Sequence, residues 1–269
     1  MKNFASVIFA LMIINYKNCQ VHYTIEGEGA PVVLLHGFLE NLKMWQPILP
    51  ALTKTHQVIS IDLLGHGETE CLGYVHRMET MADVVLAVLQ HEQVEKAHFI
   101  GHSMGAYVAL ALAEQQPELF KGLCLMNSTF EADTPERQQI RTRACKMAQH
   151  NYQTLIELSF ANLFSEESKT TYKEAYQNAL NEALQTPLQG YIAAQEGMKL
   201  RPNRLEVFKN LEGQQLIIAG KKDQLINREQ VLKTIEGSRI TYVEFSEGHM
   251  SYIENKKELT YNILQFIEK

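Results

Sequence analysis

Short apolar runs alternate with amphipathic segments along most of this chain. Strands covered by helices on both faces are apolar almost throughout, so such runs predict the strands of a parallel sheet. They lie at residues 32–35, 57–62, 97–100, 123–127, 216–220 and 240–245. Residues 78–90, by contrast, carry their apolar side chains at helical spacing. The alternation predicts an α/β fold: a mostly parallel, twisted sheet flanked by helices.

Both ends of the chain extend this pattern. Residues 13–16 and 20–25 predict a hairpin that turns at Lys17 and Asn18. Further helices are expected at residues 106–114, 227–236 and 256–267. With 45% hydrophobic residues, the 269-residue chain can bury a sizeable core in one domain.

The middle of the chain, residues 128–214, contains no comparable apolar run. Its periodicity predicts helices at residues 132–148, 152–161, 166–184 and 187–199. We therefore expect a helical insertion at residues 129–210. The remaining residues, 1–128 and 211–269, would form the α/β core.

A serine between two glycines, in the run Gly101-His102-Ser103-Met104-Gly105, separates a predicted strand from a predicted helix. A sharp strand–helix turn through such a serine presents its hydroxyl at the tip, near the positive end of the helix. The glycines leave room for close strand–helix packing. The pattern predicts a nucleophile elbow with Ser103 as the nucleophile. The alternative is an ordinary turn whose serine caps the helix.

Partners for a reactive serine occur after later strands. Asp223 follows the strand at 216–220, and His249 follows the strand at 240–245. Both positions are at the carboxyl edge of the predicted sheet, where open α/β sheets bind ligands. The order serine, aspartate, histidine is the order of the elbow-type serine hydrolases.

An oxyanion site is predicted after the first parallel strand. His36-Gly37-Phe38 stands where such hydrolases supply one backbone donor. The expected donors are the backbone N–H groups of Phe38 and of Met104, the residue after the serine. His36 itself is interpreted as structural, because the base comes last in this chain order.

Different roles for these polar residues stay open. Asp223 could be a turn carboxylate, and His249 an ordinary loop histidine. Glu247 is the main rival for orienting the base, although it lies only two residues from His249. Asp62 is interpreted as fixing the loop after its strand.

Taken together, these motifs resemble the α/β-hydrolase superfamily, in its serine-nucleophile, carboxylesterase-like branch with a helical cap. The similar pieces span nearly the whole chain in the expected order: residues 36–38, 62–67, 101–105, 220–223 and 248–249. The resemblance implies a catalytic triad of Ser103, Asp223 and His249, with the helical insertion as a cap over the site. Serine as nucleophile argues against the haloalkane dehalogenase and epoxide hydrolase branches, which use aspartate there.

The cap is expected to contribute an apolar pocket for an acyl or alkyl group. The candidate pocket residues are Leu39, Phe130, Met147, Phe160, Phe164 and Met198. Alternatively, these residues only pack the cap helices against one another. For any one of them, this packing role is at least as well supported as a pocket role. The insertion also carries a basic group, Arg137, Arg141, Arg143 and Lys146. Acidic neighbours favour a solvated helix face over a site for an anionic partner, such as a carboxylate substrate or a phosphopantetheine carrier.

Composition narrows the function classes. The formal charge of −6 and the pI near 5.9 argue against nucleic-acid binding, which requires a basic face. Four scattered cysteines show no metal-ligand spacing, so free thiols in a reducing compartment are expected, with no metal and no organic cofactor. An apolar stretch at residues 4–14 is too short to span a bilayer. A cytoplasmic location is favoured over an export signal at residues 1–14.

The sequence therefore predicts a hydrolase that cleaves a small carboxylic ester through a serine acyl-enzyme, acting on a small-molecule acyl substrate. Lactone, thioester or carbon–carbon bond hydrolysis would use the same residues. The same fold could also serve a cofactor-free lyase, a perhydrolase or a non-catalytic receptor for a small ligand. The oligomeric state is left open.

Overall fold

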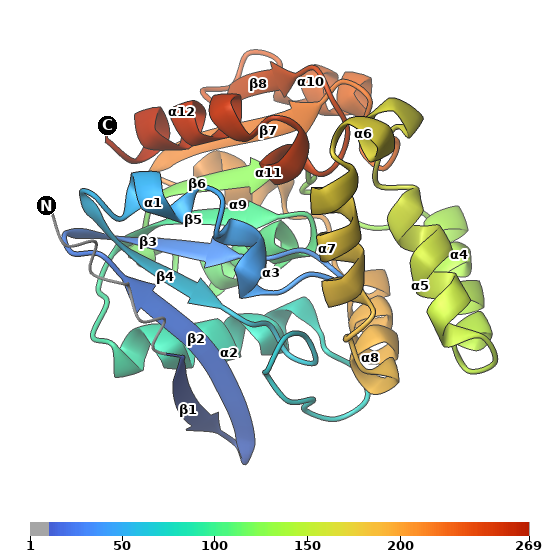
Figure 1. Ribbon diagram of the computed structural model, residues 1–269. Helices are drawn as coiled ribbons and strands as arrows, with labels where there is room; N and C mark the ends of the chain where they lie inside the picture. The colour runs from blue at the N-terminus through green and yellow to red at the C-terminus, as the bar shows by residue number, and fades with distance from the viewer. Residues whose placement is uncertain (1–10, 269) are drawn as a thin grey trace, which may run out of the picture.

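The computed structural model describes residues 11–268, in which eight strands form one sheet (Figure 1). The strands are β1 (Met12–Tyr16), β2 (Cys19–Glu26), β3 (Ala30–Leu35), β4 (His56–Ile61), β5 (Ala97–His102), β6 (Phe120–Met126), β7 (Gln214–Gly220) and β8 (Thr241–Phe245). Their order across the sheet is β1-β2-β4-β3-β5-β6-β7-β8. The strand β2 pairs antiparallel with both β1 and β4, and all pairs from β4 to β8 are parallel. The predicted mostly parallel sheet is confirmed.

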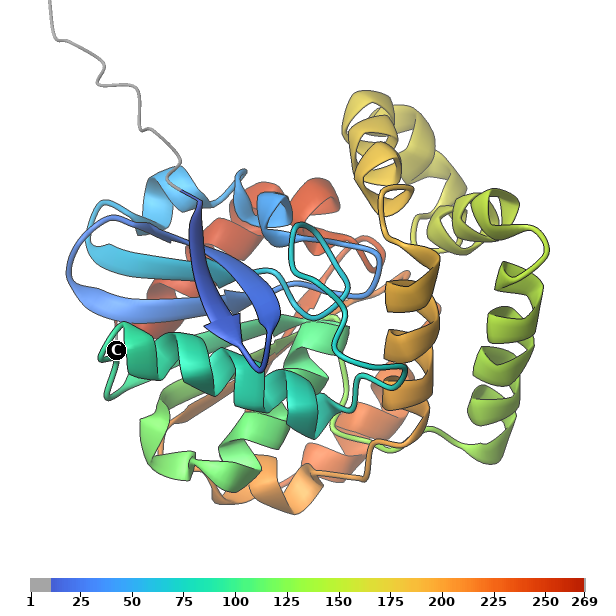
Figure 2. The same ribbon diagram turned by 90° about the horizontal axis from the view of Figure 1, so that it is seen from below.

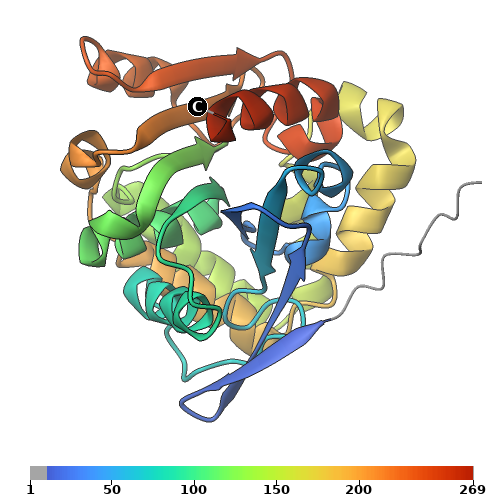
Figure 3. The same cartoon turned by 90° about the vertical axis from the view of Figure 1, so that its left-hand side faces the viewer.

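Helices cover both faces of the sheet, as the apolar strands require. One layer contains α2 (Met78–His91), α3 (Met104–Gln115), α9 (Leu205–Asn210) and α10 (Arg228–Ile235), and the other contains α1 (Leu49–Leu52) and α12 (Lys256–Ile267). In β3, Val33 and Leu35 face the first layer, and Val32 and Leu34 face the second. Figure 2 shows the first layer from below, and Figure 3 shows β2 and β8 running in clearly different directions because the sheet twists.

Six helices lie between β6 and β7 in the chain. The last, α9, belongs to the first layer, and the other five lie beside the carboxyl ends of the parallel strands (Figure 1). They are α4 (Pro135–Ala148), α5 (Tyr152–Ala161), α6 (Glu166–Thr171), α7 (Lys173–Ala183) and α8 (Leu188–Lys199). The prediction of a single helix over residues 166–184 is wrong. That segment divides at Tyr172, whose hydroxyl donates to the carbonyl oxygen of Glu254 at 2.9 Å and ties the break to the core. The short helices α1, α9 and α11 (Ser251–Glu254) were not predicted.

The helix α8 packs directly on loops of the core. A Cβ atom at Gly190 would overlap the carbonyl oxygen of Gly65, and one at Gly197 would overlap that of His76. The backbone N–H of His76 donates to the carbonyl oxygen of Ala193 at 2.9 Å. Glycine therefore allows this helix to approach the core closely enough for backbone contact.

The predicted hairpin is confirmed, with Lys17 and Asn18 at its turn in the left-handed region (φ 50° and 64°). Most of the apolar stretch at residues 4–14 lies outside the described residues, and its last three residues belong to β1. Within residues 11–268, no helix has the length and apolar character needed to cross a bilayer. The four cysteines are free.

Candidate active site

Ser103 stands at a strained turn between β5 and α3. Its backbone angles are φ 48° and ψ −110°, a region that a non-glycine residue occupies only when its surroundings hold it there. The N–H of Ser103 donates to the carbonyl oxygen of Met126 at 2.9 Å, and its own carbonyl oxygen accepts from Ser128 Oγ at 2.8 Å. The serine hydroxyl forms no cap hydrogen bond with α3. Ser103 thus stands at the N-cap position of α3 without capping the helix through its side chain.

The flanking glycines are sterically required at this turn. A Cβ atom at Gly105 would overlap the carbonyl oxygen of Leu35, and one at Gly101 would overlap the backbone of Ala106. Both contacts involve backbone atoms, which cannot rotate away as a side chain could. The turn thus packs α3 against β3 and β5 at a distance that only glycine permits.

A buried histidine and aspartate lie at the same edge of the sheet. His249 Nδ1 is 2.8 Å from Asp223 Oδ2, and both side chains are almost fully buried. Burial alone would raise the pKa of Asp223, but the contact with His249 and hydrogen bonds from Leu225 N and Asn127 hold that pKa below its usual value. The carboxylate is therefore ionised at neutral pH, and it orients the imidazole with Nε2 as the nitrogen left for other partners.

Ser103 and His249 line one cavity of about 260 Å³. Among the described residues, no hydrogen bond joins the Ser103 hydroxyl to His249. Phe38 also lines this cavity. Within residues 11–268, neither the N–H of Phe38 nor that of Met104 donates to another residue. The cavity thus brings together Ser103, Phe38 and His249, the last of which is paired with Asp223 behind it.

Similarity to known proteins identifies the family of this chain. The family model for the alpha/beta hydrolase fold matches residues 30–256. The chain belongs to the α/β-hydrolase fold family. It is a hydrolase of that fold, as the resemblance in its sequence motifs predicted.

Individual relatives of this α/β hydrolase differ in activity. The chain is 27% identical over 258 residues to 3-oxoadipate enol-lactonase 1 of Acinetobacter baylyi, covering 94% of this chain and 95% of that protein. It is 29% identical over 257 residues, 92% of its length, to the dihydrolipoyllysine-residue acetyltransferase component of the acetoin cleaving system of Pseudomonas putida, but spans only 66% of that relative. A thermophilic esterase from Thermogutta terrifontis, solved with malate bound, superposes with a TM-score of 0.87 at 26% identity, covering 96% and 98% of the two chains.

Asn127 holds together the two loops that carry Asp223 and His249 in this α/β hydrolase. Its side-chain amide donates to Asp223 Oδ2 at 3.3 Å and to the carbonyl oxygen of Gly248 at 3.1 Å. The amide oxygen accepts from Ser251 Oγ at 2.6 Å. Asn127 is fully buried and has φ 47°, so its backbone leaves β6 in the left-handed region. In the sequence pattern this residue is only the end of a predicted strand.

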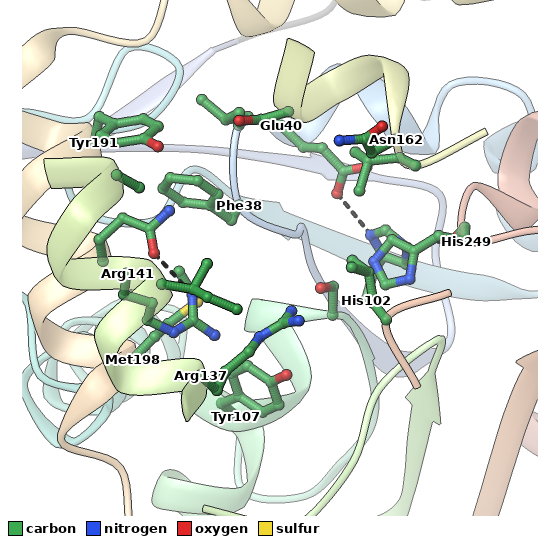
Figure 4. Close-up of a pocket in the computed structure, with 18 of the residues that line it drawn as sticks. Phe38, Glu40, His102, Tyr107, Arg137, Arg141, Asn162, Tyr191, Met198 and His249 are labelled. Carbon is green, nitrogen blue, oxygen red and sulfur yellow. Dashed lines mark hydrogen bonds and ion pairs between the residues drawn. The ribbon is translucent and has the colours of Figure 1, made fainter. Parts of the chain in front are cut away.

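A second buried pair, Glu40 and His102, was also not predicted as part of the site. Glu40 Oε2 is 2.7 Å from His102 Nδ1 and accepts from the N–H of Gly37 at 2.6 Å (Figure 4). His102 Nε2 lies 3.0 Å from the carbonyl oxygen of His249. Both residues line the cavity. His102 could be singled out from the sequence because it lies inside the serine motif. Nothing in the sequence indicates that it pairs with Glu40.

Two further polar residues have the structural roles predicted for them. His36 Nε2 accepts from the N–H of Leu63 at 2.9 Å, and its Nδ1 lies 2.7 Å from the carbonyl oxygen of Gly37. Asp62 accepts from the N–H of Leu42 at 2.8 Å and from that of Glu68 at 2.9 Å. Burial raises the pKa of Asp62 to about 6. These residues fix the loops around the cavity and do not line it.

Glu247 does not orient His249. Its carboxylate is 2.8 Å from Lys222 Nζ, in a pair that is partly exposed. The side chains of neighbouring turn residues point in different directions, which leaves Asp223 as the partner of the imidazole.

Only two of the six candidate pocket residues, Leu39 and Met198, line this cavity. Phe130, Phe160 and Phe164 are buried in the hydrophobic core clusters instead. The assignment of Met147 to a pocket is wrong, because its side chain is 54% exposed on α4. Unpredicted lining residues include Tyr107, Ile140, Asn162, Tyr191, Gln195 and Ile226.

The basic group on α4 does not form a uniformly solvated face, contrary to expectation. Arg141 is 8% exposed, and Arg137 and Arg141 both line the cavity (Figure 4). Arg143 and Lys146 are exposed. The interpretation was wrong for two of the four because the inner face of α4 packs over the site and not over solvent.

Proposed function

We propose that this α/β hydrolase cleaves small carboxylic esters through a serine acyl-enzyme, with Ser103, Asp223 and His249 as its catalytic triad. The observation that carries the proposal is the buried hydrogen bond between His249 and Asp223, in one cavity with a serine held at a strained turn. The turn frees the hydroxyl from capping α3, which supports its use as a nucleophile.

In the first step, Ser103 Oγ attacks the ester carbonyl carbon while His249 Nε2 takes the hydroxyl proton. The negative charge that develops on the carbonyl oxygen is stabilised by the N–H groups of Phe38 and Met104. Asp223 stabilises the imidazolium and keeps its tautomer. The carbon–oxygen bond to the alcohol then breaks, and the alcohol leaves with the proton from His249.

In the second step, His249 removes a proton from water as the water attacks the acyl carbon. Collapse of this second tetrahedral intermediate returns the proton to Ser103 and releases the carboxylic acid. No step requires a metal or an organic cofactor.

The volume of the cavity limits the size of the substrate. About 260 Å³ is below the usual range of pockets for drug-sized ligands, so a short acyl chain is expected. A small lactone is the second candidate, supported by the likeness to 3-oxoadipate enol-lactonase 1 over nearly the whole chain. We also propose that residues 129–210 act as a cap over the site and that the enzyme works in the cytoplasm, where its free cysteines suit reducing conditions.

The test is hydrolysis of p-nitrophenyl esters from acetate to laurate by the wild type and by Ser103→Ala. We expect highest kcat/KM at short chain lengths and a loss of kcat of roughly 10⁴-fold or more in the variant, because triad members act as a unit. Thermal melting of both proteins controls for folding. Near-normal turnover by a folded Ser103→Ala protein would rule out the assignment.

A further inference from the structure

The cavity beside Ser103 is lined by a cation, Arg137, that forms no ion pair with another residue of 11–268. The Arg137 side chain lines the cavity together with Ser103 and His249, and Figure 4 shows its guanidinium pointing into the cavity beside Tyr107. In the part of the chain that the structure describes, this guanidinium donates no hydrogen bond and forms no ion pair, although the backbone N–H of Arg137 is bonded to Thr134. A partly buried, unpaired arginine at a reaction cavity needs an explanation.

The two neighbouring arginines, unlike Arg137, form ion pairs. Arg141 is paired with Asp133 and also donates to Gln195 Oε1 at 2.8 Å. Arg201 donates to Asp133 Oδ1 at 2.6 Å and lies over the ring of Tyr107, 3.9 Å from its centre. The carboxylate of Asp133 is thus shared by Arg141 and Arg201, and within residues 11–268 it forms no ion pair with Arg137.

The electrostatics of Arg137 indicate which ligand would complete the site. Burial, and then the positive charge of Arg141, lower the pKa of Arg137 from its usual value. The guanidinium still carries its charge at neutral pH, because the ordinary pKa of arginine lies far above neutrality. Burial of this charge has a desolvation cost, which a bound anion would offset.

We propose that the substrate carries a carboxylate, which binds the Arg137 guanidinium while Ser103 reacts with the ester group in the same cavity. This inference rests on the proposed function and names its substrate class. A planar guanidinium matches the two oxygens of one carboxylate in a bidentate pair. Arg137 is the only cavity-lining guanidinium without a partner in residues 11–268, which suits one carboxylate better than a doubly charged phosphate.

The first experiment compares two p-nitrophenyl esters with five-carbon acyl chains, the hemiglutarate and the valerate, which differ in a terminal carboxylate. We expect the wild type to prefer the hemiglutarate. Arg137→Gln should lower the ratio of the two kcat/KM values by about 10- to 100-fold, the usual effect of losing hydrogen bonds to a charged group. Arg137→Lys should retain part of the preference. Background hydrolysis of each ester is measured with Ser103→Ala.

The matched control is Arg143→Gln, the same substitution on the exposed side of the same helix. It should leave the ratio within about twofold of the wild type, since it removes a charge at a similar distance along α4 without touching the cavity. A ratio that is unchanged in Arg137→Gln, or reduced equally in Arg143→Gln, would overturn the carboxylate site.

A binding measurement separates this inference from the proposed function. Calorimetric titration of glutarate into Ser103→Ala should show binding that weakens at least about tenfold when Arg137→Gln is added. Arg137-dependent glutarate binding supports the site even if no ester is hydrolysed, in which case only the proposed function fails. Serine-dependent hydrolysis of the valerate ester without Arg137-dependent binding of glutarate overturns only the inference. Tighter binding of inorganic phosphate than of glutarate would overturn the choice of carboxylate.

Discussion

His102 Nε2 lies 3.0 Å from the carbonyl oxygen of His249, so the residue before the proposed nucleophile supports the loop of the proposed base. The other ring nitrogen, Nδ1, is 2.7 Å from Glu40 Oε2. Burial alone would lower the pKa of His102, but the adjacent Glu40 carboxylate and the carbonyl of His249 raise it above its usual value. A protonated imidazole donates to both partners and neutralises a carboxylate that is 5% exposed.

We predict that His102→Gln destabilises the protein in a pH-dependent way. Removing one partner of a buried ion pair costs about 3–5 kcal/mol, which is expected here below pH 6.5. Because the folded-state pKa is raised, the stability from this proton is fully present below the unfolded pKa of about 6.5 and is lost as the pH rises through the folded pKa. The free energy of unfolding, measured in urea from pH 6 upward, should therefore fall more steeply for the wild type. Equal pH slopes for both proteins would show that His102 is not charged when folded.

The pairing of Asp223 with His249 predicts a large effect of Asp223→Asn on catalysis. An amide at this position retains the size of the side chain, but it no longer stabilises the imidazolium and favours the wrong tautomer. We expect kcat to fall by roughly 10⁴-fold, as in other serine triads. Glu247→Gln is the matched control, because Glu247 is bonded to Lys222 at the surface and should change kcat by less than about twofold. A larger loss in Glu247→Gln than in Asp223→Asn would reverse the assignment of the orienting carboxylate.

The aromatic residues of the helical insertion are predicted to affect stability and not substrate specificity. Phe160 is fully buried, with its ring centre 5.7 Å from that of Phe164 and 6.0 Å from that of Tyr176. Phe160→Ala should lower the free energy of unfolding by about 3–5 kcal/mol through the cavity it leaves. Met147→Ala, at an exposed position on α4, should change it by less than about 0.5 kcal/mol. A Phe160→Ala protein of normal stability but altered ester chain-length preference would restore Phe160 as a pocket residue.

Much of the site was predictable because its chemistry depends on local features of the sequence. The glycines around Ser103 indicate a tight turn from the local sequence alone. They are needed because a Cβ atom at either position would overlap backbone atoms of β3 or α3. Asp223 and His249 each follow an apolar strand, and parallel strands bring their carboxyl ends to one edge. The helix boundaries at Tyr172 were less predictable, since a hydrogen bond to the distant Glu254 accompanies the break.

The sequence by itself determined the positions of the strands and most longer helices along the chain, the turn at Ser103 and the residues of the proposed triad, because periodicity and turn chemistry act over a few neighbouring residues. Only the tertiary structure decided which side of α4 faces the cavity. That helix has charged residues on several sides, so its pattern does not distinguish Arg137 from Arg143. The packing of α4 beside α8, over the carboxyl ends of the strands, half-buries Arg137 and leaves Arg143 exposed. Burial and charge pairing arise from contacts between segments far apart in the chain, and these give the cavity its unpaired cation.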